Sequence, residues 1–275
     1  MIPTRFTFTQ SNLSCFKYCA RRFELRYMKQ MIWPVQPSEE QAAFQETMEA
    51  GNRFHQLVHQ HLLGVPRDIL DRIAKADRFP LFEQWYRNWL RAGFGDLPQP
   101  IFPEHTLAIQ FEEFLLSAKY DLLLPKPGRI IIFDWKTSHK PPNPSFLFKS
   151  LQTKVYTVVL SEALKNESDQ VDINSLRMTY WEANFPDIDI NIEPTTDQLA
   201  QYRAEILDLI KDIASESQQF LKTVRLERCA ICEYRTFCER QSEAEPISSD
   251  LVIEEEALLS GQTLPVEQFL TPPWM

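Results

Sequence analysis

Glycine is scarce in this chain of 275 residues, which contains only six. No G-x4-G-K-[ST] motif is present, so the sequence does not encode the phosphate-holding loop of an ATP-driven motor. Long apolar runs are also missing, and none approaches the roughly 20 residues needed to cross a bilayer. The first five residues lack the basic and then apolar pattern of a secretory signal. We therefore expect a cytoplasmic protein that does not contact membranes.

Cysteine is sparse and odd in number, with five in the chain. An odd count without a secretory signal favours reduced thiols or a metal site over a disulfide framework. Cys229, Cys232 and Cys238 lie close together in the sequence, and three neighbouring thiolates suggest a site for a soft metal. No fourth cysteine lies nearby, and only Cys15 and Cys19 remain to supply one.

Basic residues are outnumbered, because 29 Lys and Arg face 38 Asp and Glu and give a net charge of −9. The imbalance is local: residues 241–275 carry seven acidic residues and no Lys or Arg, whereas residues 1–30 carry six basic residues and one acidic residue. Local patches rather than net charge steer a partner, so the sequence is compatible with a polyanionic partner. We expect residues 241–275 to form an acidic tail that is disordered or docks elsewhere.

The period of the apolar residues changes along the chain. It is helical up to about residue 92, with a long amphipathic segment over 39–63 and an aromatic-rich segment over 67–92. Strands are predicted at 106–111, 114–124, 129–136 and 176–182, and helices at about 146–165 and 196–221. This order predicts an α/β fold with a helical insertion at about 38–100. We expect one domain over residues 1–240, which ends in a Cys-rich loop at 226–240.

Two aspartates, Asp121 and Asp134, end neighbouring predicted strands. Carboxylates at the ends of adjacent antiparallel strands can converge on a hard divalent cation such as Mg²⁺. Lys136 follows Asp134 by two residues, so side-chain alternation puts both on one face and directs Trp135 away. The D-x-K pattern by itself is common, and a salt-bridged strand end is its more frequent explanation.

Two helical patterns accompany the aspartates. Gln152 and Tyr156 lie four residues apart, on one face of a predicted helix. Gly51 lies inside a predicted helix one turn before His55, and a glycine there costs about 1 kcal/mol relative to alanine. The glycine therefore indicates close packing or the approach of a ligand. His55 and His59 are also four residues apart, which leaves a two-histidine zinc site as an alternative.

Taken in order, these motifs resemble the RecB/AddB-type, iron–sulfur exonuclease-like branch of the PD-(D/E)XK nuclease superfamily. The resemblance spans about residues 9–240 and implies a restriction-endonuclease-like core, in which helices flank a mixed central sheet. It implies a Mg²⁺- or Mn²⁺-dependent deoxyribonuclease, because metal ions stabilise the charge that develops during phosphodiester hydrolysis. The sequence departs from the family at Ala118, where glycine is common. The matching motifs are Gly51-x3-His55, Glu104, Asp121, Asp134-x-Lys136 and Gln152-x3-Tyr156.

The resemblance also assigns roles to individual residues. Lys136 matches the catalytic lysine, which positions or polarises the attacking water. Gln152 and Tyr156 match residues that organise this lysine and the bound strand, and Glu104 matches an acidic position near the metals. The matched metal ligands are the side chains of His55, Asp121 and Asp134 and the main-chain carbonyl of Trp135.

The segment around Cys19, Tyr18-Cys19-Ala20-Arg21-Arg22-Phe23, resembles the Cys-Pro-x-x-Phe segment of iron–sulfur family members, with alanine in place of proline. In AddB-type nucleases and four-cysteine CRISPR adaptation exonucleases, one N-terminal and three C-terminal cysteines hold a [4Fe–4S] cluster. Structural Zn²⁺ is the alternative occupant, and Cys15 is the rival N-terminal ligand, one helical turn earlier. Such a site would join the two ends of the chain. The implied ligands are Cys19, Cys229, Cys232 and Cys238.

The resemblance therefore implies a DNA nuclease, which we expect to be an exonuclease on single strands or ends in DNA repair, recombination or CRISPR-type processing. Arg21, Arg22 and Arg26, with the aromatic residues Phe23 and Tyr27, would guide a strand by charge and stacking. The alternative function is a non-catalytic DNA-binding or scaffold subunit, with a helicase or another protein as partner. The joint presence of all the predicted catalytic residues favours the enzyme.

Overall fold

The computed structural model describes residues 2–3, 6–33, 39–165, 175–215 and 219–240, so the predicted acidic tail at 241–275 lies outside the described residues. The strands are β1 (Thr7–Thr9), β2 (Phe102–Phe111), β3 (Phe114–Lys126), β4 (Arg129–Lys136), β5 (Leu176–Glu182) and β6 (Asp189–Ile192). The α-helices are α1 (Gln10–Tyr18), α2 (Ala20–Phe23), α3 (Glu39–Leu62), α4 (Arg67–Ala76), α5 (Phe82–Arg91), α6 (Pro144–Lys149), α7 (Leu151–Lys165) and α8 (Thr196–Ala214). None of the helices in these ranges is both long and apolar enough to cross a membrane.

One six-stranded mixed sheet forms the centre of the fold. Its strand order is β1-β3-β4-β5-β6, and β2 also pairs with β3. The β2–β3, β3–β4 and β5–β6 pairs are antiparallel, whereas the β1–β3 and β4–β5 pairs are parallel. Leu122 on β3 pairs with Phe133 on β4, so Asp121 and Asp134 are the next positions on the two strands. Asp134 lies near the end of β4, but Asp121 lies inside β3 and not at its end as predicted. The predicted α/β fold with helices flanking a mixed central sheet is confirmed.

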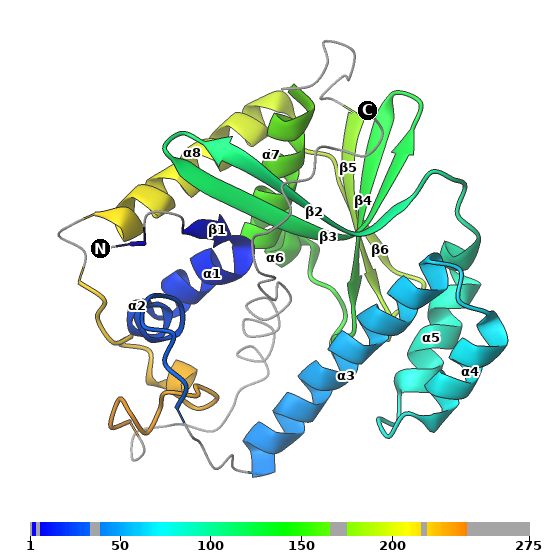
Figure 1. Cartoon of the computed structure of the whole chain (residues 1–275), viewed down its shortest axis with the longest axis horizontal. Helices are drawn as coiled ribbons and strands as arrows, with labels where there is room; N and C mark the ends of the chain where they lie inside the picture. The colour runs from blue at the N-terminus through cyan, green and yellow to red at the C-terminus, as the bar shows by residue number, and fades with distance from the viewer. Residues whose placement is uncertain (1, 4–5, 34–38, 166–174, 216–218, 241–275) are drawn as a thin grey trace.

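The strand β4 contributes alternate side chains to two separate hydrophobic cores. Ile132 belongs to the core beneath α1, α7 and α8, whereas Phe133 and Trp135 belong to the core beneath α3, α4 and α5. Figure 1 shows these two helical layers on opposite sides of the sheet. Because side chains alternate with a period of two residues, Asp134 and Lys136 continue the face of Ile132 and point toward α7.

Several element boundaries differ from the sequence prediction. The strands β1 and β6 have only three and four residues, which is too short for a periodic pattern to reveal them. The predicted helix at 67–92 is two helices, α4 and α5, and the predicted helix at 146–165 is α6 and α7. The second break occurs at Ser150, which has an extended backbone with ψ of 148°. The helix α8 ends at Ala214 rather than near residue 221.

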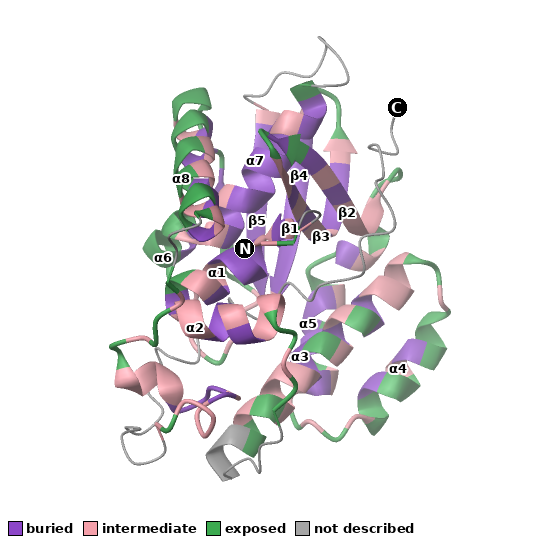
Figure 2. Ribbon diagram, turned by 60° about the vertical axis from the view of Figure 1, so that its left-hand side comes forward, coloured by how far each residue is buried: buried purple, intermediate pink, exposed green. Residues whose placement is uncertain are grey.

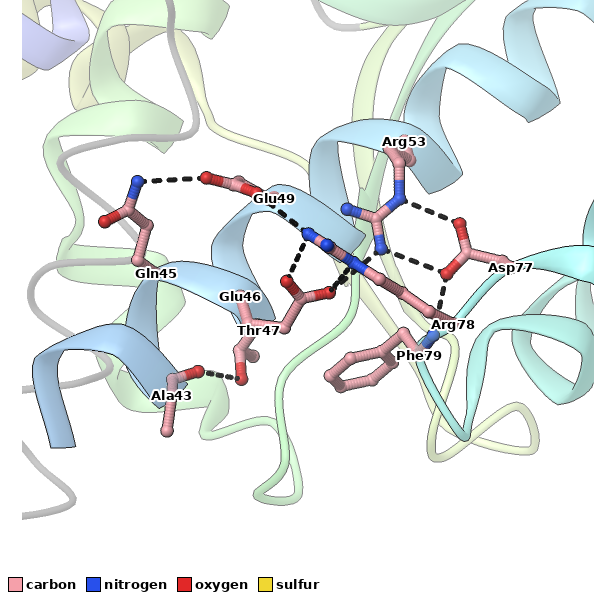
Figure 3. Close-up of polar contacts among 9 residues, drawn as sticks. All are labelled: Ala43, Gln45, Glu46, Thr47, Glu49, Arg53, Asp77, Arg78 and Phe79. Carbon is pink, nitrogen blue, oxygen red and sulfur yellow. Dashed lines mark hydrogen bonds and ion pairs between the residues drawn. The ribbon is translucent and has the colours of Figure 1, made fainter. Parts of the chain in front are cut away.

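An ion-pair network joins α3 to the segment between α4 and α5 (Figure 3). Arg53 on α3 donates two hydrogen bonds to Asp77, at 2.8 and 3.0 Å. Glu46 accepts hydrogen bonds from Arg78 at 3.1 and 2.6 Å and from Arg53 at 3.2 Å. Asp77 also accepts the main-chain N–H of Phe79 at 2.8 Å. The network fixes α3, which lines the cavity described below, against the rest of its helical layer.

Replacing Asp77 with asparagine should lower the free energy of unfolding by about 1–2 kcal/mol at pH 7, because it removes charged hydrogen bonds in a partly exposed place. Burial would raise the pKa of the Asp77 carboxyl, but its bonds with Arg53 lower that pKa below the ordinary value of 3.8. A carboxyl with a lowered pKa stabilises the fold above its ordinary pKa and loses this contribution as the pH falls. Urea unfolding should therefore show a smaller difference between wild type and Asp77→Asn at pH 3 than at pH 7.

The matched control is Asp68→Asn on α4. Asp68 pairs with Arg72 on an exposed helix face, so its loss should change the stability little at either pH. A stability difference for Asp77→Asn that stays constant between pH 7 and pH 3 would contradict this account of the network.

Candidate active site

A cavity of about 310 Å³ lies between α3 and the strands β2, β3 and β4. Five of the residues predicted for the site line this cavity: His55, Glu104, Asp121, Trp135 and Lys136. The other lining residues come from α3, from β3 and from the turn after β4: Thr47, Met48, Gly51, Asn52, Gln56, His59, Lys119, Thr137 and Ser138. The cavity therefore combines carboxylates, an imidazole and an ammonium group that are far apart in the sequence.

His55, Glu104 and Asp121 form a group whose ligand atoms all lie within 4.8 Å of one another. Nδ1 of His55 is 3.1 Å from Oδ1 of Asp121. Glu104 on β2 lies opposite Asp121 on β3, because the neighbouring residues Pro103 and Leu122 pair with each other. Its φ is 51°, in the left-handed region. Such strain costs about 1–3 kcal/mol and is concentrated at functional sites. Two carboxylates and one imidazole form a donor set that suits Mg²⁺ or Mn²⁺.

Asp121 is held by the neighbouring strand. The main-chain N–H of Trp135 donates to Oδ2 of Asp121 at 2.7 Å, and this leaves Oδ1 directed at His55. Burial would raise the pKa of Asp121, but the charge of His55 lowers it. Burial would also lower the pKa of His55, yet the carboxylates of Asp121 and Glu104 raise it. The carboxylates therefore favour a positive charge at this place in the cavity.

Asp134, Lys136 and Gln152 bond to one another in a closed set of three. Nζ of Lys136 lies 2.7 Å from Oδ2 of Asp134 and donates to Oε1 of Gln152 at 2.9 Å. Nε2 of Gln152 donates to Oδ1 of Asp134 at 2.6 Å. Burial raises the pKa of Asp134 to about 6, although Lys136 opposes the shift. Asp134 is only 2% exposed and lies outside the cavity lining, so its predicted role as a metal ligand stays a prediction.

Tyr156 lies deeper than the other predicted residues, within the core beneath α7. Its ring meets the ring of Tyr120 edge-on at a centroid distance of 5.1 Å. Burial raises the pKa of Tyr156 well above its ordinary value, while a hydrogen bond with Gln152 opposes the shift. Tyr156 therefore bonds to Gln152 from within the core and does not line the cavity.

The strand β5 supplies two side chains that sequence reasoning missed. The ring centre of Tyr180 lies 5.8 Å from Nζ of Lys136, and the Tyr180 hydroxyl is 2.7 Å from Oγ1 of Thr153. Glu182 pairs in register with Lys136 and accepts the N–H and the hydroxyl of Ser138 at 3.3 and 3.4 Å. The sequence did contain a signal for these residues, because Tyr180 and Glu182 alternate at the carboxyl end of a predicted strand. In the structure this end lies beside Lys136 on the parallel strand β4.

The turn after Lys136 is held by side chains from two other parts of the chain. Nδ2 of Asn184 donates to the main-chain oxygens of Thr137 and Ser138 at 3.1 and 2.9 Å. The indole N–H of Trp85 on α5 donates to Oδ1 of Asn184 at 2.7 Å. A Cβ added to Gly51 on α3 would lie 2.9 Å from Oγ1 of Thr137. Close packing, one of the two reasons expected for Gly51, is therefore present.

His59 lines the same cavity as His55 but lies outside the group that His55 forms with Glu104 and Asp121. In the part of the chain that the structure describes, no group of three ligand side chains within 4.8 Å contains both histidines. The structure therefore favours His55, rather than a two-histidine zinc site, as the imidazole of the cavity.

Four cysteines line a second, small cavity, and none of the five in the chain forms a disulfide. The four are the predicted ligands Cys19, Cys229, Cys232 and Cys238. Cys15 lies instead in the core that includes α1. Burial raises the pKa of the Cys229 thiol, and the nearby Cys19 and Cys238 add to the shift. One N-terminal and three C-terminal cysteines thus line the same cavity, although among the described residues no three of their Sγ atoms lie within 4.8 Å of one another.

Ion pairs and aromatic packing join the N-terminal segment to the segment around these cysteines. Arg22 is buried and lies 2.7 Å from Glu233, and Arg21 pairs with Glu24. Phe23 is 0% exposed and stacks on Phe220 inside the core. The prediction that Arg22 and Phe23 guide a strand is therefore wrong, because neither side chain reaches the surface.

The PD-(D/E)XK nuclease superfamily matches residues 7–239 of this chain. No curated protein matches it. SSO0001, a protein of known crystal structure, is 15% identical and is similar over 86% of this chain and 88% of its own, with a TM-score of 0.42. Since the family match covers most of the sequence, including every residue that lines the cavity between α3 and the sheet, the chain belongs to the PD-(D/E)XK nuclease superfamily.

Proposed function

We propose that this chain is a Mg²⁺- or Mn²⁺-dependent deoxyribonuclease that acts as an exonuclease on single strands or ends. The observation that carries the proposal is one cavity that is lined both by a donor group for a hard cation and by Lys136. Phosphodiester hydrolysis develops negative charge on the phosphate and on the leaving oxygen, and a cation held by the donor group, together with the Lys136 ammonium, would stabilise that charge. DNA repair, recombination or CRISPR-type processing is the proposed context.

His55, Glu104 and Asp121 would hold the metal ion, with Asp134 and the main-chain carbonyl of Trp135 as the other proposed ligands. The donor set fits, because carboxylates and a single imidazole suit hard divalent cations. When bound, such an ion polarises the phosphate and lowers the pKa of a coordinated water.

Lys136 would stabilise charge on the phosphate and orient the attacking water. Burial by itself would lower its pKa, but Asp134 raises it, so the side chain stays protonated at neutral pH. Gln152 bonds to both members of the pair and fixes the position of the ammonium. A charge that is held in place before the reaction needs no reorganisation during it. Glu182 and Asn184 support the same position through the turn that follows Lys136.

We also infer the RecB/AddB-type branch of the superfamily, with a [4Fe–4S] cluster on Cys19, Cys229, Cys232 and Cys238. Four thiolates are the usual ligands of such a cluster, and Zn²⁺ is the alternative that the same set would accept. The proposal is supported by the four cysteines that line one cavity and by basic side chains in the same lining, which would offset the charge of the thiolates. These basic residues of the cavity are Arg22, Lys222, Arg235 and Arg240.

Lys136→Ala should fold but lose cleavage by roughly 100-fold or more, because it removes a preorganised charge from the reacting phosphate. The measurement is the rate of cleavage of end-labelled single-stranded DNA with Mg²⁺, together with circular dichroism to check the fold. Lys126→Ala, at the exposed end of β3, is the control and should cut at the wild-type rate. Wild-type cleavage by Lys136→Ala would show that the catalytic assignment is wrong.

His55→Ala should raise the Mn²⁺ concentration needed for half-maximal cleavage by roughly tenfold or more, because it removes one of three donor groups. His59→Ala should change the Mn²⁺ dependence far less, since His59 lies outside that group. Titration of the cleavage rate with Mn²⁺ separates the two variants. A larger effect of His59→Ala than of His55→Ala would reverse the assignment.

Protein purified without oxygen should contain iron and sulfide and should absorb visible light. Cys19→Ser should lose the iron and unfold at a lower temperature, because the site links distant parts of the chain. Cys15→Ser should keep the iron, since Cys15 does not line the cavity. Metal analysis that finds zinc and no iron would reject the cluster but retain the four-thiol site.

A further inference from the structure

The stretch from residue 135 to residue 161, which runs from the end of β4 through α6 and most of α7, differs in charge from the rest of this acidic chain. From residue 135 to residue 161 it contains four Lys and one His and no Asp or Glu, in a sequence with 38 acidic residues. The short helix α6 lies in this segment and ends at Lys149, three residues before Gln152 of α7. A basic segment beside a phosphodiester-cleaving site is suited to a polyanion.

The helix α6 is anchored next to the catalytic residues through Leu147. Its side chain is 8% exposed, and its main-chain oxygen accepts the hydroxyl of Thr153 at 2.6 Å. The same hydroxyl lies 2.7 Å from the hydroxyl of Tyr180, whose ring lies beneath Nζ of Lys136. The position of α6 is therefore tied to the position of the catalytic lysine.

Two phenylalanines of α6 remain at the surface on either side of Leu147. Phe146 is 37% exposed and Phe148 is 38% exposed. Figure 2 draws most of α6 as exposed, at the edge of the molecule beside α8. The ring of Phe148 meets Tyr202 of α8 edge-on at a centroid distance of 6.4 Å, which supports the ring from one side. Two exposed aromatic rings on a six-residue helix offer flat apolar surface where a polar surface residue would otherwise be expected.

We propose that α6 is a stacking platform for the unpaired bases of single-stranded DNA that enters or leaves the active site. The proposal rests on the proposed nuclease function and names its substrate class. Phe146 and Phe148 stack on bases, because every base has a flat π-face and aromatic side chains bind such faces without regard to sequence. Duplex DNA does not fit this surface, since its bases are stacked on one another and their faces are covered.

The charge around α6 comes from few side chains. Lys154 pairs with Glu205 and lies 5.5 Å from the ring centre of Tyr202, so it is already partnered. Lys149, the last residue of α6, is exposed and lies next to Phe148. Stacking on the rings therefore carries the selectivity for single strands, and Lys149 contributes a contact to the backbone phosphates.

The test measures binding of a fluorescently labelled oligothymidylate and of a labelled blunt duplex by anisotropy, in EDTA so that no metal-dependent cleavage occurs. Replacing Phe146 and Phe148 together with alanine should weaken binding of the single strand by roughly 5- to 150-fold for each stacked ring. Binding of the duplex should change by less than about twofold, since all of its base faces except the outer faces of the two terminal pairs are covered. Ile69→Ala with Ile73→Ala on α4 is the matched control, because these residues are similarly exposed but lie on another helix.

Salt dependence separates stacking from charge. Lys149→Ala should reduce the slope of log affinity against log salt by about 0.7, the value for one phosphate of a single strand. The double phenylalanine variant should lose affinity at every salt concentration with the wild-type slope. If that variant does not fold, the double leucine variant keeps apolar contact with Tyr202 and should show the same selective loss on single strands.

Unchanged binding of the single strand, or an equal loss on single strand and duplex, would overturn the proposal for α6. Cleavage by the wild-type protein with Mg²⁺ or Mn²⁺ is measured in parallel. If the wild type cuts DNA while the double variant binds single strands normally, only the α6 assignment fails. If the wild type cuts no DNA under any metal condition, the proposed nuclease function fails instead.

Discussion

The hydrogen bond from the main chain of Trp135 to Asp121 joins the two strands on which the cavity depends. It holds one oxygen of Asp121 and leaves the other directed at His55. At the same residue, the Trp135 side chain enters the core beneath α3, α4 and α5, and alternation then turns Asp134 and Lys136 toward α7. A slip of one residue in β4 would exchange these faces, placing charges in the core and an indole beside α7. The packing of the Trp135 side chain therefore fixes the register of β4 and, with it, the positions of Asp134 and Lys136.

The burial of charged side chains is the main energetic cost of this arrangement. Asp134 and Lys136 lose hydration and recover part of that loss from each other and from Gln152. Asp121 recovers part of it from His55 and from a main-chain N–H. The surrounding turn adds rigidity, because the helical layer α3–α5 reaches it through Trp85 and Asn184. Preorganisation of this kind trades stability for function, which is typical of enzyme active sites.

Much of the site followed from the sequence because its signals are local. The alternation of Asp134, Trp135 and Lys136 predicted which side chains share a face, and the glycine at Gly51 predicted a close approach that the structure contains. The fold class and most strands followed from apolar periodicity. The parallel pairing of β1 with β3, the support from Asn184 and the burial of Phe23 did not follow, because each depends on contacts between distant parts of the chain. The basic and aromatic side chains of Arg22 and Phe23 therefore suggested a binding surface, but the fold buries both.

We propose that the cavity between α3 and the sheet binds a divalent cation and hydrolyses phosphodiester bonds. The most direct measurement incubates the purified wild-type chain with end-labelled single-stranded and double-stranded DNA, with Mg²⁺, with Mn²⁺ and with EDTA. We expect the single strand to be shortened from an end in the presence of either metal and to stay intact in EDTA. DNA that stays intact with both metals while the protein still binds it would contradict the account and would favour a non-catalytic DNA-binding subunit.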